Sequence, residues 1–294
     1  ATNVVEQPLL TILTPIGLDH VELLGSTLQS IAGEKAGILK RGVDCVVARQ
    51  DAAAFGVIER RAAKISARLH VFGSDFDAYE QHGRLVYQDQ DGLLDLPLPA
   101  LAGRHQVENA GVAIAAALRL GPLTVGEEAI ENGLTTLDWP ARLQRLSHGG
   151  LARVLPAGSE IWLDGGHNSA AAAAMAQAMA DREERVALPL VLVVGMLATK
   201  DPRSFLSPFR GLAAEVVAVP IADTSRAYAK ALNPSRIAGD ASLLGLSART
   251  AASLEAALEL AAKLVGGPVR VLVCGSFHLA GGVLALEETA ARAN

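Results

Sequence analysis

The sequence predicts an α/β protein made of two domains. Its 294 residues exceed the usual size of one domain and are enough for two, and half of them are hydrophobic, so each domain can bury a core. Short apolar runs rich in β-branched residues alternate with helical stretches, which is typical of a parallel sheet. The alternation breaks near residue 138 and then resumes, so we place a domain boundary there.

The first domain combines a parallel part with hairpins. Strands are predicted at 9–14, 44–49 and 69–72, and helices between them at 26–39 and 51–68. The stretch 76–98 carries turn signals at His-Gly and Asp-Gly between short strands, which predicts β-hairpins. Two further helices are expected at about 104–119 and 125–136.

The second domain is predicted to be a doubly wound sheet. After the break come three short strands in a row, RLQRLS, ARVLPAG and EIWLDG. Alternation then returns, with helices at 168–182, about 201–212, 250–265 and about 278–292, and strands at 189–195, 215–220 and 269–275. Ligands of such sheets bind in the loops beyond the carboxyl ends of the strands.

The composition argues against several classes of partner. The formal net charge is −5, and no run of Lys or Arg is present, so nucleic acid is not an expected partner. No apolar run approaches the length of about 20 residues that a membrane span needs. Two cysteines, Cys45 and Cys274, are too few for a disulfide framework and fit a reducing cytoplasm.

A lysine is placed on the apolar stripe of the first helix. Ser26 and Gln29 have the spacing of a capping box that would start this helix. Lys35 then lies three, four or seven residues from the helix's apolar positions. One interpretation is a lysine that extends its amine to solvent at the rim. The other is a buried, neutral amine with a chemical task, since burial favours the uncharged form.

Two polar positions in this domain have equally open interpretations. His20 follows an apolar run, where it is either an ordinary loop residue or a metal ligand beyond a strand end. His105 and Asn109 lie one helical turn apart. They are either ordinary polar residues at a helix start or part of a site where the Asn amide holds an adenine edge.

Three strand ends of the second domain carry polar chemistry. DGGHN (164–168) has the form of a strand–turn–helix loop that presents backbone N–H groups to a phosphate. VGMLATKD (194–201) brings Lys200 and Asp201 to a second strand end, and CGSFHLAGGV (274–283) brings Ser276 and His278 to a third. Three such loops in one domain predict a ligand site at this edge of the sheet.

Together these segments resemble the folylpolyglutamate synthase/dihydrofolate synthase family of the Mur ligase superfamily. The resemblance rests on an ordered set of segments: ATNVV, LDH, SIAGEKAGI, LAGRHQVENA, WPARLQ, DGGHN, GMLATKD and GSFH. It spans the chain from residue 1 to about 283. It implies that residues 1–137 are the C-terminal portion of a central ATP-binding domain and residues 138–294 a Rossmann-like glutamate-ligase domain.

The sequence departs from this family at its start. It contains no G-x-x-x-x-G-K-[ST] loop, which cradles ATP phosphates. The glutamate and the serine that help to bind magnesium in the family are also missing. We therefore expect an N-terminally truncated chain that is inactive by itself.

The resemblance implies a role for each candidate residue of the first domain. His20 would bind Mg²⁺. Lys35 would be carbamylated, and the carbamate would be an anion that supports the metal site. Asn109 would contact adenine.

For the second domain it implies a set of residues around the triphosphate and the acyl group. Arg142 would bind ATP phosphates, and Asp164 would hold the ribose or the adjacent phosphates. His167 and Ser276 would lie near the incoming glutamate and the acyl phosphate. Lys200 and Asp201 stay open between a structural role and contact with ATP.

The activity implied is ATP-dependent ligation of L-glutamate to dihydropteroate, to the γ-carboxylate of folates, or to both, through an acyl phosphate. The cofactor implied is Mg²⁺, with ATP as substrate, and we expect a monomer when the enzyme is full length. The alternatives are another Mur-type amino-acid ligase, and a non-catalytic binding module without the phosphate loop.

Overall fold

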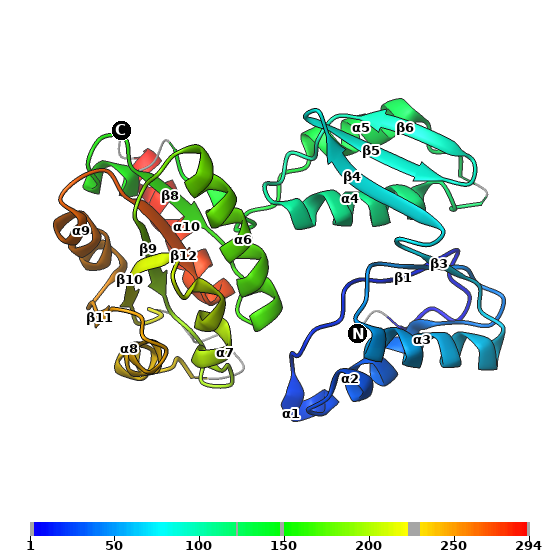
Figure 1. Ribbon diagram of the computed structural model, residues 1–294, viewed down its shortest axis with the longest axis horizontal. Helices are drawn as coiled ribbons and strands as arrows, with labels where there is room; N and C mark the ends of the chain where they lie inside the picture. Colours follow the sequence, from blue (N-terminus) through cyan, green and yellow to red (C-terminus); the bar gives the residue numbers. More distant parts are fainter. Residues whose placement is uncertain (1–2, 122, 148–149, 223–229, 293–294) are drawn as a thin grey trace. The chain divides into compact units, whose positions relative to one another are not determined.

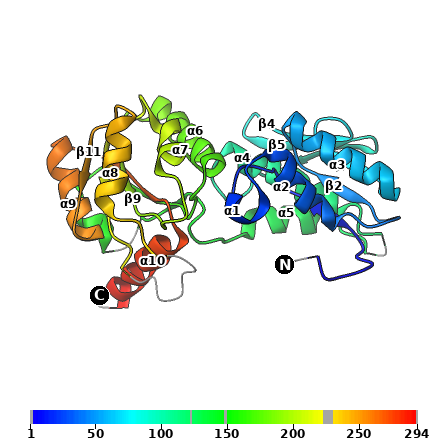
Figure 2. The same cartoon turned by 90° about the horizontal axis from the view of Figure 1, so that it is seen from below.

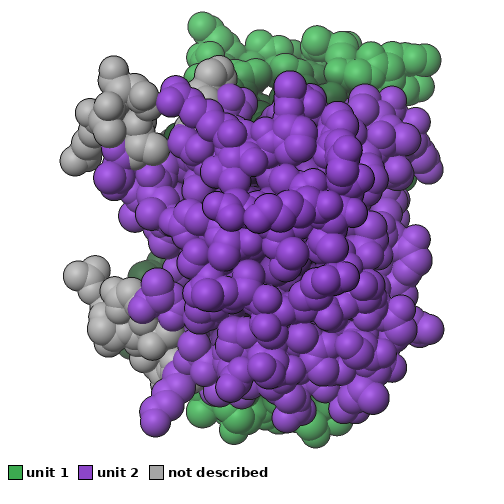
Figure 3. Space-filling model, turned by 90° about the vertical axis from the view of Figure 1, so that its left-hand side faces the viewer, with its two compact units in different colours: residues 1–138 green, residues 139–294 purple. Residues whose placement is uncertain are grey.

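The computed structural model describes residues 3–121, 123–147, 150–222 and 230–292. The chain divides into two compact units, Ala1–Asp138 and Trp139–Asn294, which Figure 3 colours separately. None of the described helices combines the length and the apolar character that crossing a membrane demands.

Unit 1 begins with the predicted parallel sheet, and this prediction is confirmed. Strands β1 (Thr11–Leu13), β2 (Cys45–Val47) and β3 (Leu69–Val71) pair in the order β1-β2-β3. The connecting helices are α1 (Val21–Leu24), α2 (Leu28–Lys35), the 3₁₀ turn η1 (Ala36–Ile38) and α3 (Ala52–Ile65). Helix α3 starts where the Asp51 side chain accepts a hydrogen bond from the Ala53 N–H at 2.8 Å, an N-cap that satisfies a free donor.

The predicted hairpins form a separate antiparallel sheet of β4 (Phe76–Gln81), β5 (Arg84–Asp89) and β6 (Gly92–Leu96). His82 and Gly83, with φ of 51° and 76°, make the two-residue turn between β4 and β5, as a type I′ hairpin requires. Helix α4 (Arg104–Ala117) packs on this sheet, as Figure 1 shows, and α5 (Glu127–Thr136) follows. Gly111 permits the approach, because a Cβ there would lie 2.4 Å from Ala78 Cβ.

The predicted start of α2 is wrong by one residue. Thr27, not Ser26, is the N-cap: its hydroxyl accepts a hydrogen bond from the Ser30 N–H at 3.1 Å. The Ser30 hydroxyl accepts from the Thr27 N–H at 3.3 Å and so completes the capping box. Gln29 takes no part in that box, because a serine at the third helical position does the work that was assigned to it.

Unit 2 is built on a six-stranded sheet in the order β11-β10-β9-β12-β8-β7. Its strands are β7 (Gln144–Arg145), β8 (Glu160–Leu163), β9 (Leu190–Val194), β10 (Ala213–Ala218), β11 (Ala248–Thr250) and β12 (Arg270–Cys274). All neighbours are parallel except the short edge strand β7, which is antiparallel to β8. The central strands read as continuous apolar runs because both faces are covered.

Helices cover both faces of this sheet, which makes the unit doubly wound. One group consists of α6 (Ser169–Arg185), α7 (Pro202–Leu206) with the 3₁₀ turn η3 (Ser207–Phe209), and α8 (Pro234–Leu243). The other consists of α9 (Leu254–Val265) and α10 (Phe277–Arg292). Figure 2 separates α6 and α7, at the top of unit 2, from α10 at the bottom.

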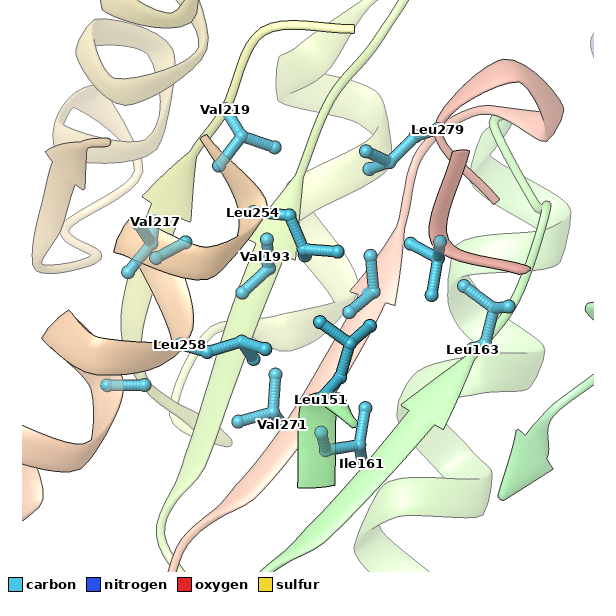
Figure 4. Close-up of a cluster of buried hydrophobic side chains, with 14 of the residues drawn as sticks. Leu151, Ile161, Leu163, Val193, Val217, Val219, Leu254, Leu258, Val271 and Leu279 are labelled. Atoms are coloured by element: carbon cyan, nitrogen blue, oxygen red, sulfur yellow. The ribbon is translucent and has the colours of Figure 1, made fainter. Parts of the chain in front are cut away.

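The core under α9 and α10 shows how the strands are fixed. Figure 4 shows side chains of four strands pointing toward the helix side chains Leu254, Leu258 and Leu279. The labelled strand residues are Ile161, Leu163, Val193, Val217 and Val271. Burying each such side chain stabilises the fold by about 1.5–3 kcal/mol relative to exposure. This core therefore fixes the strand ends that carry the polar loops.

Two predictions for unit 2 are wrong. The stretch 152–158 is not a strand: the 3₁₀ turn η2 (Leu151–Val154) occupies its start, because Leu151 and Leu155 both turn into the core. Helix α8 and strand β11 were not predicted, and the helix expected at 250–265 begins only at Leu254. Strand β11 lies at the sheet edge with no buried residue, so it lacks an apolar run.

Candidate active site

Three neighbouring strands of unit 2 end at one edge of its sheet. Strands β9, β12 and β8 are adjacent and parallel, with Val194 beside Cys274 and Val273 beside Leu163. The Gly275 N–H donates to the Gly166 carbonyl at 2.9 Å, and the Gly195 N–H donates to the Cys274 carbonyl at 3.3 Å. The three polar loops predicted from the sequence are therefore tied together, at the edge where doubly wound sheets bind ligands.

Glycine is required where the second and third loops meet. Gly275 has a φ of 102°, and a Cβ on it would lie 2.8 Å from the Gly195 carbonyl oxygen. A residue with a side chain would be strained there and would push the two loops apart. This close backbone contact fixes the start of α10 relative to the end of β9.

Asp164 holds two backbone segments together. Its carboxylate is buried, and Oδ1 accepts a hydrogen bond from the Gly166 N–H at 2.6 Å. Oδ2 accepts from the Leu143 N–H at 2.9 Å, across 21 residues of sequence. The Gly165 N–H also donates to the Ala141 carbonyl at 3.0 Å. The expected ribose or phosphate contact would therefore share a carboxylate that already accepts two backbone hydrogen bonds.

Arg142 sits between two residues in an unfavourable backbone conformation. Ala141 has φ 58° and Leu143 has φ 42°, both in the left-handed region that costs a non-glycine residue about 1 kcal/mol or more. The Gln144 side chain accepts a hydrogen bond from the Ala141 N–H at 3.0 Å. Strain of this kind persists only where the surroundings impose it, and it is concentrated at functional sites.

The DGGHN turn leads into α6 as the sequence predicts. The Asn168 side chain caps the helix by accepting a hydrogen bond from the Ala171 N–H at 2.9 Å. His167 is half-buried, and its Nδ1 lies 3.2 Å from the Gly165 carbonyl oxygen. A carbonyl only accepts, so the hydrogen bond requires a proton on Nδ1, and in the neutral tautomer that satisfies it Nε2 is the acceptor nitrogen.

Ser276 is buried and already has a structural partner. Its Oγ accepts a hydrogen bond from the His278 N–H at 3.1 Å and caps the start of α10. Asp201 likewise caps α7, accepting from the Arg203 N–H at 3.1 Å and the Ser204 N–H at 3.3 Å. This helix cap is sufficient to explain an aspartate at position 201. Lys200, next to it in the sequence, is half-buried.

His20 belongs to unit 1 and lies in a short acidic segment. It is exposed and has a φ of 51°. Its Nδ1 lies 3.8 Å from Glu22 Oε1, and its Nε2 lies 4.0 Å from Asp19 Oδ2. Within the described residues no cluster of three or more His, Cys, Asp or Glu side chains is suited to a metal ion. These residues therefore do not make a magnesium site by themselves.

Of the two interpretations of Lys35, the structure supports the lysine that extends its amine to solvent and contradicts the buried amine. Ile31, Ala32 and Ala36 are buried on the inner face of this segment, but Lys35 is exposed. It is the last residue of α2, and the chain continues as η1. A lysine in a last turn can extend its amine beyond the helix end, where a positive charge is favoured by the helix dipole. Burial therefore provides no neutral amine here.

Asn109 lies on α4 in unit 1 with its side chain exposed. Its Nδ2 donates to Gln106 Oε1 at 3.1 Å, and Gln106 Nε2 lies 3.0 Å from His105 Nε2. These contacts hold the amide in one orientation at the start of the helix. The second N–H of Nδ2 and the Oδ1 acceptor are the groups with which this amide could contact an adenine edge.

Unit 1 also contains a polar cavity of about 670 Å³. Its lining includes Arg68, His70, Asp89 and Arg119, and none of the residues that the sequence analysis selected. Asp89 accepts hydrogen bonds from Arg119 and from the hydroxyl of Tyr87. Because Asp89 and Arg119 pair with each other and no residue selected from the sequence lines the cavity, we place the candidate site at the strand ends of unit 2 instead.

One residue of the site was missed in the sequence analysis. Phe277, the first residue of α10, lies between Arg142 and His167. In the sequence analysis Phe277 belongs to the GSFH segment but has no role of its own. The available signal was the pair Gly165-Gly166, since adjacent glycines after a strand indicate a close approach by another group.

Comparison with known proteins places this chain in a family. Residues 151–277 match the family model described as "Mur ligase, glutamate ligase domain". The folylpolyglutamate synthase of Lacticaseibacillus casei is 33% identical over 242 residues, covering 79% of this chain and 53% of that protein. The dihydrofolate synthase/folylpolyglutamate synthase of Mycobacterium tuberculosis is 30% identical over 290 residues, covering 90% of this chain and 54% of that protein.

Solved structures of the same family also match this chain. E. coli FolC in complex with DHPP and ADP superposes with a TM-score of 0.80 at 26% identity, covering 100% of this chain and 64% of that one. The bifunctional synthase of Yersinia pestis, complexed with AMPPNP and Mn ion, gives a TM-score of 0.78 at 28% identity, covering 97% and 62%.

The fold and these matches define the chain as a member of the Mur ligase superfamily, with a central-domain region followed by a Mur ligase C-terminal domain. The chain spans 42–66% of the length of the first curated relatives it matches. It belongs to the folylpolyglutamate synthase/dihydrofolate synthase family.

Proposed function

We propose that this chain carries part of the machinery of an ATP-dependent ligase that joins L-glutamate to dihydropteroate, to the γ-carboxylate of folates, or to both. One observation supports it most directly. Three of the segments that carry the family resemblance, around Arg142, His167 and Ser276, converge at the strand ends of unit 2. In a family of ligases, this convergence favours a catalytic site over a binding module.

The proposed reaction has two steps. A carboxylate oxygen of the acceptor attacks the γ-phosphorus of ATP, the bond to the bridging oxygen breaks, and ADP leaves with that electron pair. The amine of L-glutamate then attacks the acyl carbon, inorganic phosphate leaves, and the nitrogen loses a proton as the amide forms. The protein's contribution to such transfers is mainly positioning and electrostatic stabilisation.

Arg142 is proposed to bind the phosphates. A guanidinium presents its N–H donors in a plane and can hold two phosphate oxygens at once. Its guanidinium carbon lies over the Phe277 ring, 4.8 Å from the centroid, and a cation held on an aromatic face needs none of its N–H donors for that contact. Asp164 is proposed to hold the ribose or the adjacent phosphates in addition to its backbone bonds.

His167 and Ser276 are proposed to lie near the incoming glutamate and the acyl phosphate. The Nε2 of neutral His167 can take a proton from the attacking amine. The Ser276 hydroxyl can donate a hydrogen bond while it accepts one from the His278 N–H. Asn109 is proposed to contact adenine.

Lys35 and His20 are proposed to act at a magnesium ion. When bound, Mg²⁺ would neutralise charge on the transferring phosphoryl group. The described residues supply only His20 of the ligands that the resemblance implies, so no step above depends on the metal. Since Lys35 is exposed, its carbamate would depend on a cationic neighbour, not on burial, for stability.

The proposal is tested with the complete product of the gene that encodes this chain. ADP release should depend on dihydropteroate or a folate together with L-glutamate. Arg142→Ala should lower kcat/KM for ATP by about 100-fold or more, the scale of a lost charge stabiliser. Arg145→Ala, a matched change on an exposed arginine three residues away, should stay within about threefold. Equal losses in both variants would contradict the assigned role.

Residues 1–294 alone are proposed to be inactive, because they contain no G-x-x-x-x-G-K-[ST] loop to cradle the phosphates. Phosphate release by the purified 294-residue chain with ATP, Mg²⁺, dihydropteroate and L-glutamate should stay at background. Turnover at about 1 s⁻¹ or faster, an ordinary enzyme rate, would refute this.

A further inference from the structure

Three segments that are far apart in the sequence meet on one aromatic ring. The guanidinium carbon of Arg142 lies 4.8 Å from the centroid of the Phe277 ring. The His167 ring lies edge-on to the same ring, with centroids 5.6 Å apart and an interplanar angle of 69°. Phe277 itself is 47% exposed, so burial in a core does not account for its position.

The backbone is shaped to admit this ring. A Cβ on Gly165 would lie 2.3 Å from Cδ1 and from Cε1 of Phe277, far inside contact distance. Any other residue at position 165 would displace the ring. The ring therefore packs against Gly165 in the turn after β8. In the sequence, Gly165 is one position from Asp164 and two positions from His167.

The helix that carries the ring is itself held in place. The Ser276 hydroxyl caps the first turn of α10, and the Gly275 N–H bonds to the Gly166 carbonyl at 2.9 Å. On the other side, the buried Asp164 carboxylate accepts a bond from the Leu143 N–H, the residue after Arg142. Both the ring and the arginine backbone are thus fixed to the same turn.

An aromatic face attracts a guanidinium and is also a flat surface against which it can stack. A long arginine side chain loses much rotamer freedom when it binds a phosphate, and a platform removes part of that loss beforehand. We infer that Phe277 is a positioning residue that holds Arg142 and His167 in the orientation they need for phosphate and amine. This inference rests on the proposed function of those two residues.

The first arm of the test needs no activity. In the 294-residue chain, NMR of the Arg142 Nε–H and the His167 ring protons should show ring-current shifts, with Arg142 Nε ordered. Phe277→Leu should bring these shifts close to random-coil values and lower the Arg142 order parameter below about 0.6. Phe277→Tyr keeps an aromatic face and should preserve both. Unchanged Arg142 order in Phe277→Leu would overturn the inference.

The second arm is kinetic and uses the complete gene product. Phe277→Leu should lower kcat/KM for ATP about tenfold, which corresponds to about 1.4 kcal/mol. Phe277→Tyr should remain within about twofold of wild type. Leu286→Ala, which removes a half-exposed apolar side chain farther along α10, is the matched control and should not change the rate. A rate loss in Phe277→Tyr equal to that in Phe277→Leu would count against the platform.

A second perturbation guards against misfolding of Phe277→Leu. Gly165→Ala keeps Phe277 but displaces its ring, and it should cause the same loss of Arg142 order and of kcat/KM for ATP. Preserved order and kinetics in Gly165→Ala would refute the inference. If the wild-type gene product shows no ligase activity, the proposed function fails, while the NMR arm still decides whether Phe277 positions Arg142 and His167.

Discussion

Asp164→Ala should destabilise unit 2 strongly, because the carboxylate is a clamp in the fold. The change removes two buried hydrogen bonds, at 2.6 Å to the Gly166 N–H and at 2.9 Å to the Leu143 N–H, and fills their place with nothing. A buried donor left unsatisfied costs about 1–3 kcal/mol.

Part of this loss is offset. Once Leu143 is released, the left-handed conformations at Ala141 and Leu143 can relax, which returns about 1 kcal/mol at each. Two unsatisfied donors cost about 2–6 kcal/mol together, so we expect a net loss of up to about 4 kcal/mol, with a central value of about 2 kcal/mol. Asp164→Asn retains one acceptor oxygen and should lose roughly half as much.

The assay follows from where the tryptophans lie. Both, Trp139 and Trp162, belong to unit 2, so tryptophan fluorescence during urea unfolding reports that unit alone. A loss of about 2 kcal/mol should lower the melting temperature, followed by the same fluorescence on heating, by roughly 4–8 °C for a unit of this length. Glu184→Ala, on the exposed face of α6, is the control and should change the free energy of unfolding by less than about 0.5 kcal/mol. An Asp164→Ala variant as stable as this control would refute the clamp.

Three further outcomes are expected. Arg270 is buried and donates to Glu160 Oε2 at 2.8 Å, so Arg270→Met should cost about 3–5 kcal/mol in urea unfolding. Burial alone would raise the pKa of Glu160, but hydrogen bonds led by that from Arg270 hold this pKa below its ordinary value. The stability from Glu160 is therefore present above about pH 4.3, the unfolded value, and is lost as the pH falls through the lower folded pKa. This loss should be smaller in Arg270→Met, and an unchanged pH dependence would contradict the pairing. Gly275→Ala should lower the melting temperature measured by circular dichroism, because it combines φ 102° with a 2.8 Å backbone clash, whereas Gly267→Ala, in open space, should not. Burial raises the pKa of the Cys274 thiol well above its ordinary value, so it should react with a thiol reagent at pH 8 only after unfolding; reaction within minutes in the native chain would be the contrary result.

Much of the fold followed from patterns that are local in the sequence. A strand covered on both faces is mostly apolar, so β9 was evident as a continuous run and β12 as a run in which Arg270 is the charged residue. The edge strand β11 has no buried residue and left no such signal. Periodicity placed Lys35 on the apolar face of α2, but it does not say how far along that face the core extends, and Lys35, the last residue of the helix, is exposed.

The candidate site also has features that sequence patterns predict and features that they do not. Asp164, His167 and Ser276 could be selected because each follows a predicted strand, and strand ends meet at one edge of a parallel sheet. Strand ends predict the region of the sheet where a residue lies, but they do not predict its hydrogen-bond partners. It could not reveal that Ser276 and Asp201 cap helices, since a cap depends on the residue at which the helix begins.

By itself, the sequence determined the family, the order of its motifs and the residues at the strand ends, because these depend on residue identity and local pattern. Only the tertiary structure decided that Phe277 lies between Arg142 and His167, and that Asp164 binds the backbone of Leu143. The physical reason is that these contacts join segments up to 135 positions apart (residues 142 and 277), and they use left-handed conformations beside Arg142 that local propensity disfavours. Long-range packing and hydrogen bonding stabilise what the local chain would not adopt.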